Sequence, residues 1–336
     1  MVAALTCLLL AALLTSGKIV DIARRQELGP SRDRQLAVAE QLDRVANFLS
    51  LNRPYDLIHD VRGIGSSAAT RVRTIDEVAA EHGIDGGPTT SVPAVGPTTP
   101  ASGPNTAPTT TPTTTVPEPL RRITAARPLT VLVVGDSQAE YLAQAVTTES
   151  GLALDVTADF RISTSLARPD YFNWPAQLQG FGDTTEPEAV VFFLGANDYQ
   201  DMATADGQRL VRGSDEWKAE WGRRLAIMFD LLEHDGRHVY WVSQPPMRAG
   251  DLDEGVRTIN EVAASVVASR DFVTLVDIWD LFGGDGGFAA TMTMPDGAEL
   301  RVRIDDGVHL TRGAASYVAD LVFSGFEEQW TFVEPG

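Results

Sequence analysis

The sequence predicts an α/β fold in which a parallel β-sheet is covered by helices on both faces, giving three layers. From residue 120 to the C-terminus, short and continuously apolar segments alternate with longer segments of helical periodicity. This alternation is typical of buried parallel strands that are joined by helices. It is absent from the earlier part of the 336-residue chain, so residues 120–336 are predicted to form the α/β domain.

Five apolar segments are predicted to form the strands of this sheet: residues 130–134, 153–158, 189–194, 238–243 and 273–276. Helices are predicted between them over residues 140–150, 215–233 and 255–269, and a last helix follows near the C-terminus. A β-hairpin is expected in the sequence ATMTMPDGAELRVRI, with its turn at residues 295–297. In sheets of this kind the working residues gather where the strands end.

Residues 1–23 are mostly apolar and are predicted to form a membrane anchor. The unbroken apolar run over residues 1–16 is short for a spanning helix and has no positive segment before it. A cleaved secretion signal and a buried helix of a soluble protein are therefore alternatives. Residues 24–85 are predicted to form a small helical segment next to the membrane, with a helix over residues 33–51 that packs on the anchor, a partner or its own copy.

Residues 86–119 consist almost entirely of Thr, Pro, Gly, Ala and Ser. Such a composition cannot bury a core, so this segment is predicted to be a disordered linker. Threonine- and proline-rich stalks that hold a domain away from a surface are typical of exported proteins. The protein is therefore expected at the cell membrane with its α/β domain outside the cytoplasm, or else as a secreted protein.

The composition argues against two classes of site. The formal net charge of −19 and the lack of a basic stripe argue against binding to nucleic acid, whose phosphates attract basic surfaces. The single cysteine, Cys7, provides neither a disulfide framework nor a cysteine metal site. We expect no cofactor and no metal ion.

The sequence VLVVGDSQAE places Ser137 directly after the first predicted strand, in a turn that begins with Gly135 and Asp136. A serine at this position is either a helix cap or an exposed nucleophile. A serine nucleophile needs a base, usually a histidine that a carboxylate holds in one tautomer. His309 is the candidate base, because Asp306 precedes it by three residues in the loop before the last helix. The other four histidines occupy ordinary cap, loop or turn positions.

A third motif lies in the sequence VVFFLGANDYQDM. A buried strand ends at Gly195, and Asn197 and Asp198 follow in the turn. The side-chain amide of an asparagine at a strand end can donate a hydrogen bond to a developing oxyanion. Each motif alone is common, but the three together, each at a strand end or before the last helix, are much more specific. Asp136, Gly195 and Asp198 are expected to support the site.

Together these motifs resemble the SGNH (GDSL-like) hydrolase family over roughly residues 128–326. The resemblance implies a flavodoxin-like three-layer α/β/α fold, a triad of Ser137, Asp306 and His309, and Asn197 as an oxyanion donor. It implies a further oxyanion donor, a backbone N–H, at Ser165 in RISTSLARPDYFNWP, where an actinobacterial-type branch of the family is expected to have glycine. If this position needs a positive φ, the serine strains the loop. The N–H of Ser137 itself is another candidate donor.

The motifs predict a serine esterase or acyl hydrolase that acts on an ester-bearing small molecule or on an ester of a cell-envelope glycan or lipid. An O-acyltransferase would use the same triad on a cell-wall glycan. A catalytically silent envelope-binding scaffold would keep the fold without the reaction. Aromatic side chains near the motifs are either sugar platforms or core residues; they are Tyr171, Phe172, Trp174, Trp217 and Trp221.

Overall fold

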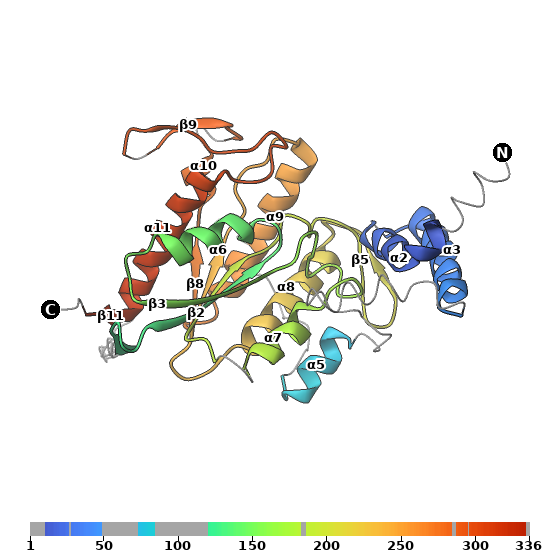
Figure 1. The fold of residues 1–336 in the computed structure, drawn as a ribbon, viewed down its shortest axis with the longest axis horizontal. Coiled ribbons are helices and arrows are strands. Elements are labelled where there is room, and N and C mark those ends of the chain that lie inside the picture. The colour runs from blue at the N-terminus through green and yellow to red at the C-terminus, as the bar shows by residue number, and fades with distance from the viewer. Residues whose placement is uncertain are drawn as a thin grey trace, which may run out of the picture.

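The computed structural model describes residues 11–26, 28–48, 73–84, 120–182, 186–283, 287–294 and 296–333. Its central element is a five-stranded parallel sheet in the order β3-β2-β4-β7-β8 (Figure 1). The strands are β2 (Leu129–Gly135), β3 (Leu154–Phe160), β4 (Ala189–Phe193), β7 (His238–Val242) and β8 (Val273–Val276). All five strands predicted from the sequence are confirmed, to within two residues at each end.

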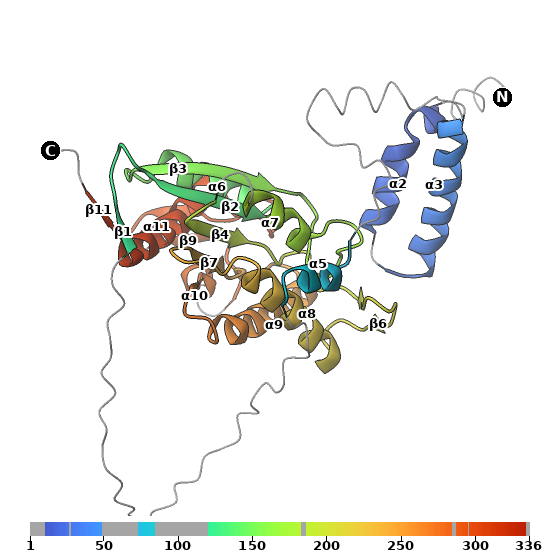
Figure 2. The ribbon, with the colours of Figure 1, turned by 90° about the horizontal axis from the view of Figure 1, so that it is seen from below.

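Helices cover both faces of this sheet (Figure 2). One face carries α6 (Ala139–Thr148) and α11 (Arg312–Gln329), and the other carries α7 (Trp174–Gly182), α8 (Asp215–Asp230) and α9 (Gly250–Val267). In β2, Val131 and Val133 belong to the first apolar core, whereas Leu132 and Val134 belong to the second. Successive side chains of a strand point to opposite faces, so a continuously apolar strand serves two cores. The predicted three-layer α/β/α arrangement is confirmed.

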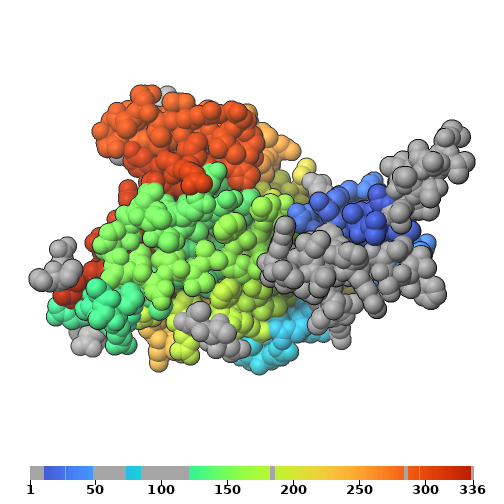
Figure 3. All heavy atoms as spheres, in the orientation of Figure 1, coloured from blue at the N-terminus to red at the C-terminus, as the bar shows by residue number. Residues whose placement is uncertain are grey.

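Short elements complete the domain. The predicted β-hairpin is confirmed as β9 (Thr291–Thr293) and β10 (Glu299–Arg301), which pair antiparallel and form a projecting lobe at the top of Figure 3. Residue 295 of its turn lies outside the described residues. The other short elements are β1 (Leu120–Ile123), which pairs with β11 (Trp330–Phe332), β5 (Met202–Ala203), which pairs with β6 (Arg209–Leu210), and α10 (Trp279–Phe282).

The N-terminal hairpin consists of α2 (Ser16–Arg25) and α3 (Pro30–Phe48), which lie side by side (Figure 2). Val20 and Ala23 of α2 pack against Ala39 of α3. The helix predicted over residues 33–51 is expected to pack on the anchor, on a partner or on its own copy. In the structure α3 contacts α2, which overlaps the segment predicted as the anchor. Residues 49–51 of that predicted helix lie outside the described ranges.

A further helix before the linker, α5 (Ile75–Glu81), lies against the α/β domain. Ile75 and Ala79 pack on Ile227 of α8. Asp76 accepts a hydrogen bond from Nη1 of Arg223, also on α8, at 2.7 Å. The chain therefore contacts the α/β domain before it enters the predicted linker.

Among the residues described, no helix combines the length and the apolar character needed to cross a membrane. Residues 1–10, with which the predicted anchor begins, lie outside these residues. The linker predicted over residues 86–119 lies outside them as well.

Candidate active site

Ser137, Asp306 and His309 lie in one hydrogen-bonded chain. Ser137 is half-buried in the turn between β2 and α6, and the other two residues lie in the loop between β10 and α11. Nε2 of His309 is 2.7 Å from Oγ of Ser137, and Nδ1 is 2.6 Å from Oδ2 of Asp306. Because an ionised carboxylate only accepts, Nδ1 carries the proton and Nε2 accepts from the serine hydroxyl. The structure thus joins residues that are 172 positions apart in the sequence.

The loop that carries His309 is folded by its own aspartate. Oδ1 of Asp306 accepts hydrogen bonds from the backbone N–H groups of Val308, at 2.8 Å, and His309, at 3.1 Å. Gly307 has a φ of +75°, and a Cβ at this position would lie 2.5 Å from Cβ of Arg248, so only glycine fits. Partial burial opposes the ionisation of Asp306, but the hydrogen bonds from His309 and Val308 outweigh it and lower the pKa of Asp306.

A second glycine fixes the position of the serine turn. Gly135 ends β2 where the chain passes very close to β4. A Cβ at Gly135 would lie 2.1 Å from the carbonyl oxygen of Phe193. This approach brings the turn with Asp136 and Ser137 next to the turn that follows β4. Asp136 N–H donates to the same Phe193 carbonyl at 3.3 Å.

Asp136 links the serine turn to the asparagine turn. Its side chain is fully buried and accepts from the N–H of Gln138 at 2.8 Å, the N–H of Gly195 at 3.2 Å and Nδ2 of Asn197 at 3.2 Å. Burial raises the pKa of Asp136 to about 6, although the N–H groups of Gln138 and Gly195 and the nearby His309 act in the opposite direction. Asp136 thus links Gly195 and the Asn197 amide to the turn that carries Ser137.

The Asn197 amide also reaches the Ser165 loop, which is the segment of residues 161–173 between β3 and α7. Nδ2 of Asn197 lies 3.3 Å from the carbonyl oxygen of Thr164, which belongs to the peptide unit that carries the Ser165 N–H. No described group accepts a hydrogen bond from the N–H of Ser165 or of Ser137. Asn197 and Ser165 are thus neighbours, but the C=O and N–H of a trans peptide point in opposite directions, so the Ser165 N–H points away from the Asn197 amide.

The conformational strain considered for Ser165 is absent. In the described residues, positive φ values outside glycine occur at Ser163, with 64°, and at Glu186, but not at Ser165. The residue of this loop with a left-handed backbone is therefore Ser163, two residues before Ser165. The side chain of Ser165 is 1% exposed, and its hydroxyl has no hydrogen-bond partner among the described groups.

Asp198 lies behind the site and holds two of its segments together. Its buried Oδ1 accepts from the N–H of Ala167 at 3.0 Å and from Nε1 of Trp221 at 2.7 Å. Burial raises the pKa of Asp198 to about 7, and the negative charge of Asp136 adds to this rise. Asp198 thereby attaches the asparagine turn to the Ser165 loop and to α8.

The tryptophans considered as sugar platforms are core residues. Trp174, Trp217 and Trp221 are at most 1% exposed and belong to the core beneath the sheet. Only Tyr171 and Phe172 of the five aromatic residues remain partly exposed.

Sequence reasoning missed Gln138, which joins the serine turn to the histidine loop. Its Nε2 donates to the carbonyl oxygen of Val308 at 3.2 Å. A main-chain acceptor has no side-chain signature in the sequence, so this contact could not be found there.

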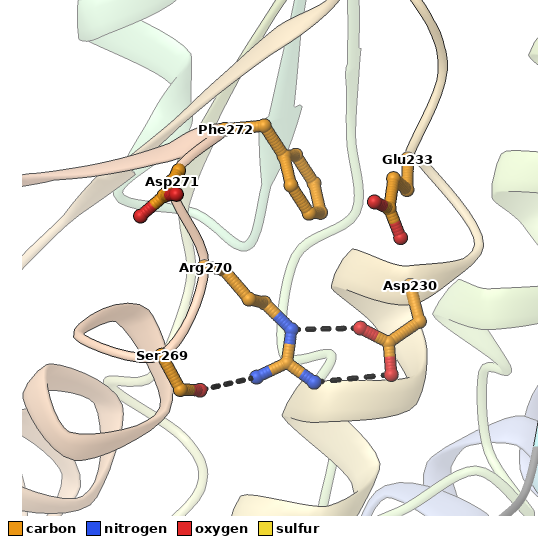
Figure 4. Close-up of a pocket in the computed structure, with 6 residues that line it drawn as sticks. All are labelled: Asp230, Glu233, Ser269, Arg270, Asp271 and Phe272. Atoms are coloured by element: carbon orange, nitrogen blue, oxygen red, sulfur yellow. Dashed lines mark hydrogen bonds and ion pairs between the residues drawn. The ribbon is translucent and has the colours of Figure 1, made fainter. Parts of the chain in front are cut away.

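A pocket of about 490 Å³ lies elsewhere, between the end of α8 and the start of β8 (Figure 4). All strands of the sheet are parallel, so their amino ends lie on one side of the sheet and their carboxyl ends on the other. The pocket lies at the amino end of β8, whereas Ser137 follows the carboxyl end of β2, so the two are far apart. Its one cation, Arg270, is paired with Asp230 through bonds of 2.7 and 3.0 Å. The described residues also contain no cluster of three or more His, Cys, Asp or Glu side chains arranged to hold a metal ion. The hydrogen-bonded chain at Ser137 is the candidate active site.

Replacing Ser165 with alanine tests whether this loop contributes only its backbone. We expect Ser165→Ala to retain full ester turnover and equal or slightly higher thermal stability, because it removes a buried hydroxyl without a partner. Ser165→Pro, which deletes the N–H, is expected to reduce kcat about a hundredfold. Both variants are compared by kinetics after circular dichroism has shown the same folded content. Loss of turnover in Ser165→Ala would assign the hydroxyl a part in the reaction.

Comparison with known proteins identifies a family model described as "Protein of unknown function (DUF459)", which matches residues 130–325. No curated protein matches the sequence.

Solved structures with a similar fold include a lipase/acylhydrolase from Enterococcus faecalis, at 15% identity and a TM-score of 0.42, over 62% of this chain and 100% of that chain. A carbohydrate esterase family 3 structure from Talaromyces cellulolyticus is 15% identical, with a TM-score of 0.41, over 60% of this chain and 97% of its own. The C-terminal catalytic domain of Streptococcus pneumoniae peptidoglycan O-acetyltransferase A is 15% identical, with a TM-score of 0.40, over 60% and 94%. Likenesses at this level transfer neither a substrate nor a reaction to this chain.

Proposed function

Since the chain belongs to the DUF459 family, whose description gives no function, we propose a function from its own site: it is a serine acyl hydrolase that cleaves an ester through nucleophilic catalysis by Ser137. One observation carries the proposal. His309 lies within hydrogen-bond distance of both Ser137 and Asp306, at 2.7 and 2.6 Å, with a separate ring nitrogen facing each. This geometry matches what a serine nucleophile requires of its base and of the group that orients the base.

The reaction follows from these contacts. Nε2 of His309 takes the hydroxyl proton of Ser137 as Oγ attacks the ester carbonyl carbon. The tetrahedral intermediate then collapses, and the imidazolium donates this proton to the departing alcohol, which leaves an acyl-serine. Water attacks the acyl-serine with His309 again as base. The imidazolium then returns this proton to Oγ of Ser137 as the acyl–oxygen bond breaks, and the acid product leaves. Asp306 stays ionised and stabilises the imidazolium, in keeping with the lowered pKa of its carboxyl.

Two donors are available for the oxyanion in the observed geometry: the N–H of Ser137 and the side-chain amide of Asn197. The N–H of Ser165 becomes a third donor when the Thr164–Ser165 peptide turns over, because its carbonyl oxygen is the group that faces Asn197. The Asn197 amide makes a bond of 3.2 Å to Asp136, which fixes its orientation, and a longer one of 3.3 Å to the Thr164 carbonyl. We assign the amide hydrogen of Asn197 that faces the Thr164 carbonyl to the oxyanion. The oxyanion is charged and is therefore a stronger acceptor than this carbonyl, so it would displace the contact. Each such donor contributes about 3–4 kcal/mol to transition-state stabilisation.

Solvent access favours hydrolysis over transfer to another acceptor. The side chains of His309 and Asp306 are 31% and 41% exposed. Water therefore reaches the base directly, and an acyl-serine beside it is open to hydrolysis. A transferase would use the same residues but would have to keep water from this position.

Labelling with a fluorophosphonate probe separates this enzyme from a catalytically silent scaffold. We expect the full-length chain to gain one adduct, located on Ser137 by peptide mass mapping. His309→Gln should label much more slowly, because the serine loses its base. Ser324→Ala, which removes an exposed hydroxyl on α11, should label like the wild type. Labelling spread over several serines, or no faster than that of heat-denatured protein, would overturn the proposal.

A further inference from the structure

Arg168 connects the N-terminal hairpin to the Ser165 loop. The residue is 2% exposed, and its guanidinium donates in three directions. Nε and Nη2 form a bidentate pair with Asp170, at 2.8 and 3.0 Å. Nη2 and Nη1 also donate to the main-chain carbonyls of Arg24 and Gln26 in the hairpin, each at 2.7 Å. A buried guanidinium therefore depends on the hairpin for two of its acceptors.

The hairpin has its own reasons to bind here. The last carbonyls of a helix lack partners within the helix and carry partial negative charge. Arg168 supplies donors and positive charge at the C-terminal end of α2. On the other side of the turn, Nη2 of Arg32 donates to Oδ2 of Asp170 at 2.8 Å. Burial opposes the ionisation of Asp170, but Arg168 and Arg32 outweigh it and lower the pKa of Asp170.

Two short paths lead from Arg168 to the proposed oxyanion donors. The first runs three residues back along the chain to Ser165. The second passes through Gln200, whose Oε1 lies 3.3 Å from Nη1 of Arg168 and whose Nε2 donates to the carbonyl oxygen of Asn197 at 2.6 Å. The guanidinium thus contacts the segments of both donors, while Ser137, Asp306 and His309 lie outside this network.

The Ser165 loop is held from the inside as well. Nη1 of Arg224, on α8, donates to the carbonyls of Leu166, at 2.9 Å, and Ala167, at 3.3 Å. Asp198 accepts from the N–H of Ala167. The core thereby fixes the residues just after Ser165, whereas the outer side of the loop, from Arg168 to Asp170, is fixed by the hairpin.

We propose that the N-terminal hairpin is a positioning element of the active site, and that Arg168 is the positioning residue through which it orders Ser165 and Asn197. The inference rests on the proposed function, because it assigns the two residues to the oxyanion. Without the hairpin, two donors of Arg168 become exposed and exchange the main-chain carbonyls of Arg24 and Gln26 for water. The guanidinium then turns toward water and releases both segments. The α/β domain is accordingly complete in fold but not in catalysis without the hairpin.

The test compares Arg168→Gln with Arg209→Gln in the full-length chain. Arg209 donates to the Leu28 carbonyl of the same hairpin at 3.2 Å but extends from β6 and is exposed, with no contact to the Ser165 loop. We expect Arg168→Gln to lower kcat for p-nitrophenyl acetate about tenfold to a hundredfold with little change in KM, since misplaced donors act on the transition state. The pH profile should keep its acid limb, because the histidine and its aspartate are untouched. Arg209→Gln should keep kcat within about twofold.

Hydrogen–deuterium exchange supplies a readout that does not depend on turnover. We expect Arg168→Gln to exchange faster in both partners of the contact, residues 16–26 and 161–172. Arg32→Gln, which weakens the contact from the hairpin side and cannot disturb the domain core, should show the same pattern with a smaller loss of kcat. This second variant keeps the test decisive if Arg168→Gln folds poorly.

A double-mutant cycle with Asn197→Ala checks the path. If Arg168 acts through the oxyanion donors, its replacement should cost much less in the Asn197→Ala background than in the wild type. Equal losses in both backgrounds, or faster exchange with unchanged kcat, would overturn the positioning role. A wild-type chain that turns over no ester yet protects residues 161–172 would instead refute the esterase and leave the hairpin contact standing.

Discussion

Replacing Ser137 with alanine is expected to reduce kcat/KM for p-nitrophenyl acetate by about 10⁴-fold or more. The variant lacks the only side-chain oxygen that His309 contacts in the serine turn, so no acyl-serine can form. What remains is the slow attack of water beside the oxyanion donors. The expected measurement is a saturation curve for wild type and variant at matched enzyme purity.

The fold of this variant should be unaffected. Ser137 is half-buried and contributes one side-chain hydrogen bond, so its loss changes the free energy of unfolding by about 1 kcal/mol or less. Ser324→Ala serves as the matched control and should keep full activity. A Ser137→Ala enzyme with more than a few per cent of wild-type turnover would remove this serine from the mechanism.

Asp306→Asn is expected to lower kcat about 10²–10³-fold. An asparagine can turn either its oxygen or its amide toward His309, but with the oxygen held by the N–H groups of Val308 and His309 the amide faces Nδ1. The imidazole must then present an unprotonated Nδ1, and Nε2 carries the proton and can no longer act as base. Because the side chains of Asp306 and His309 are partly exposed, solvent screens their interaction, and the loss of kcat is expected to be smaller than in a triad that is fully buried.

The neighbouring Asp305 offers a control of the same chemistry. Its side chain is 97% exposed and forms an ion pair with Arg301, not with the histidine. Asp305→Asn should therefore keep kcat within about twofold. Equal losses in the two variants would show that the negative charge of the loop matters only at long range, and that Asp306 does not orient the base.

The parts of the fold that the sequence predicts well are those in which one residue type repeats. β2, β4 and β7 are apolar almost throughout because both of their faces are buried, so their limits are visible to within one residue. β3 lies at the edge of the sheet, has the partly polar sequence LDVTADF and extends two residues beyond its predicted end. α9 is less well predicted, because its first turn is polar and begins at Gly250, five residues before the apolar periodicity. α7, with the sequence WPAQLQGFG, is too short to show a period and was not predicted at all.

The site was predictable where its side chains are chemically distinctive. The serine, the asparagine and the aspartate–histidine pair were each found at a strand end or before the last helix, and the structure brings them together. The contacts of Arg168 were not predictable, because its acceptors in the hairpin are main-chain carbonyls 142 and 144 residues away. Any residue type offers such a carbonyl, so the sequence carries no trace of the pairing.

The position of α5 changes what the threonine- and proline-rich linker does. α5 packs on α8 just before residue 85, and β1 begins at Leu120 and pairs with β11, so both ends of the linker are attached to one body. A linker of this length, extended as polyproline II, would span on the order of 100 Å. That reach does not separate the α/β domain from the N-terminal hairpin, because the hairpin already contacts the Ser165 loop.

A protein held at a surface by its N-terminus would keep Ser137 within a few helix lengths of that surface, α3 being about 28 Å long. It would act on esters close to its point of attachment and not on distant ones.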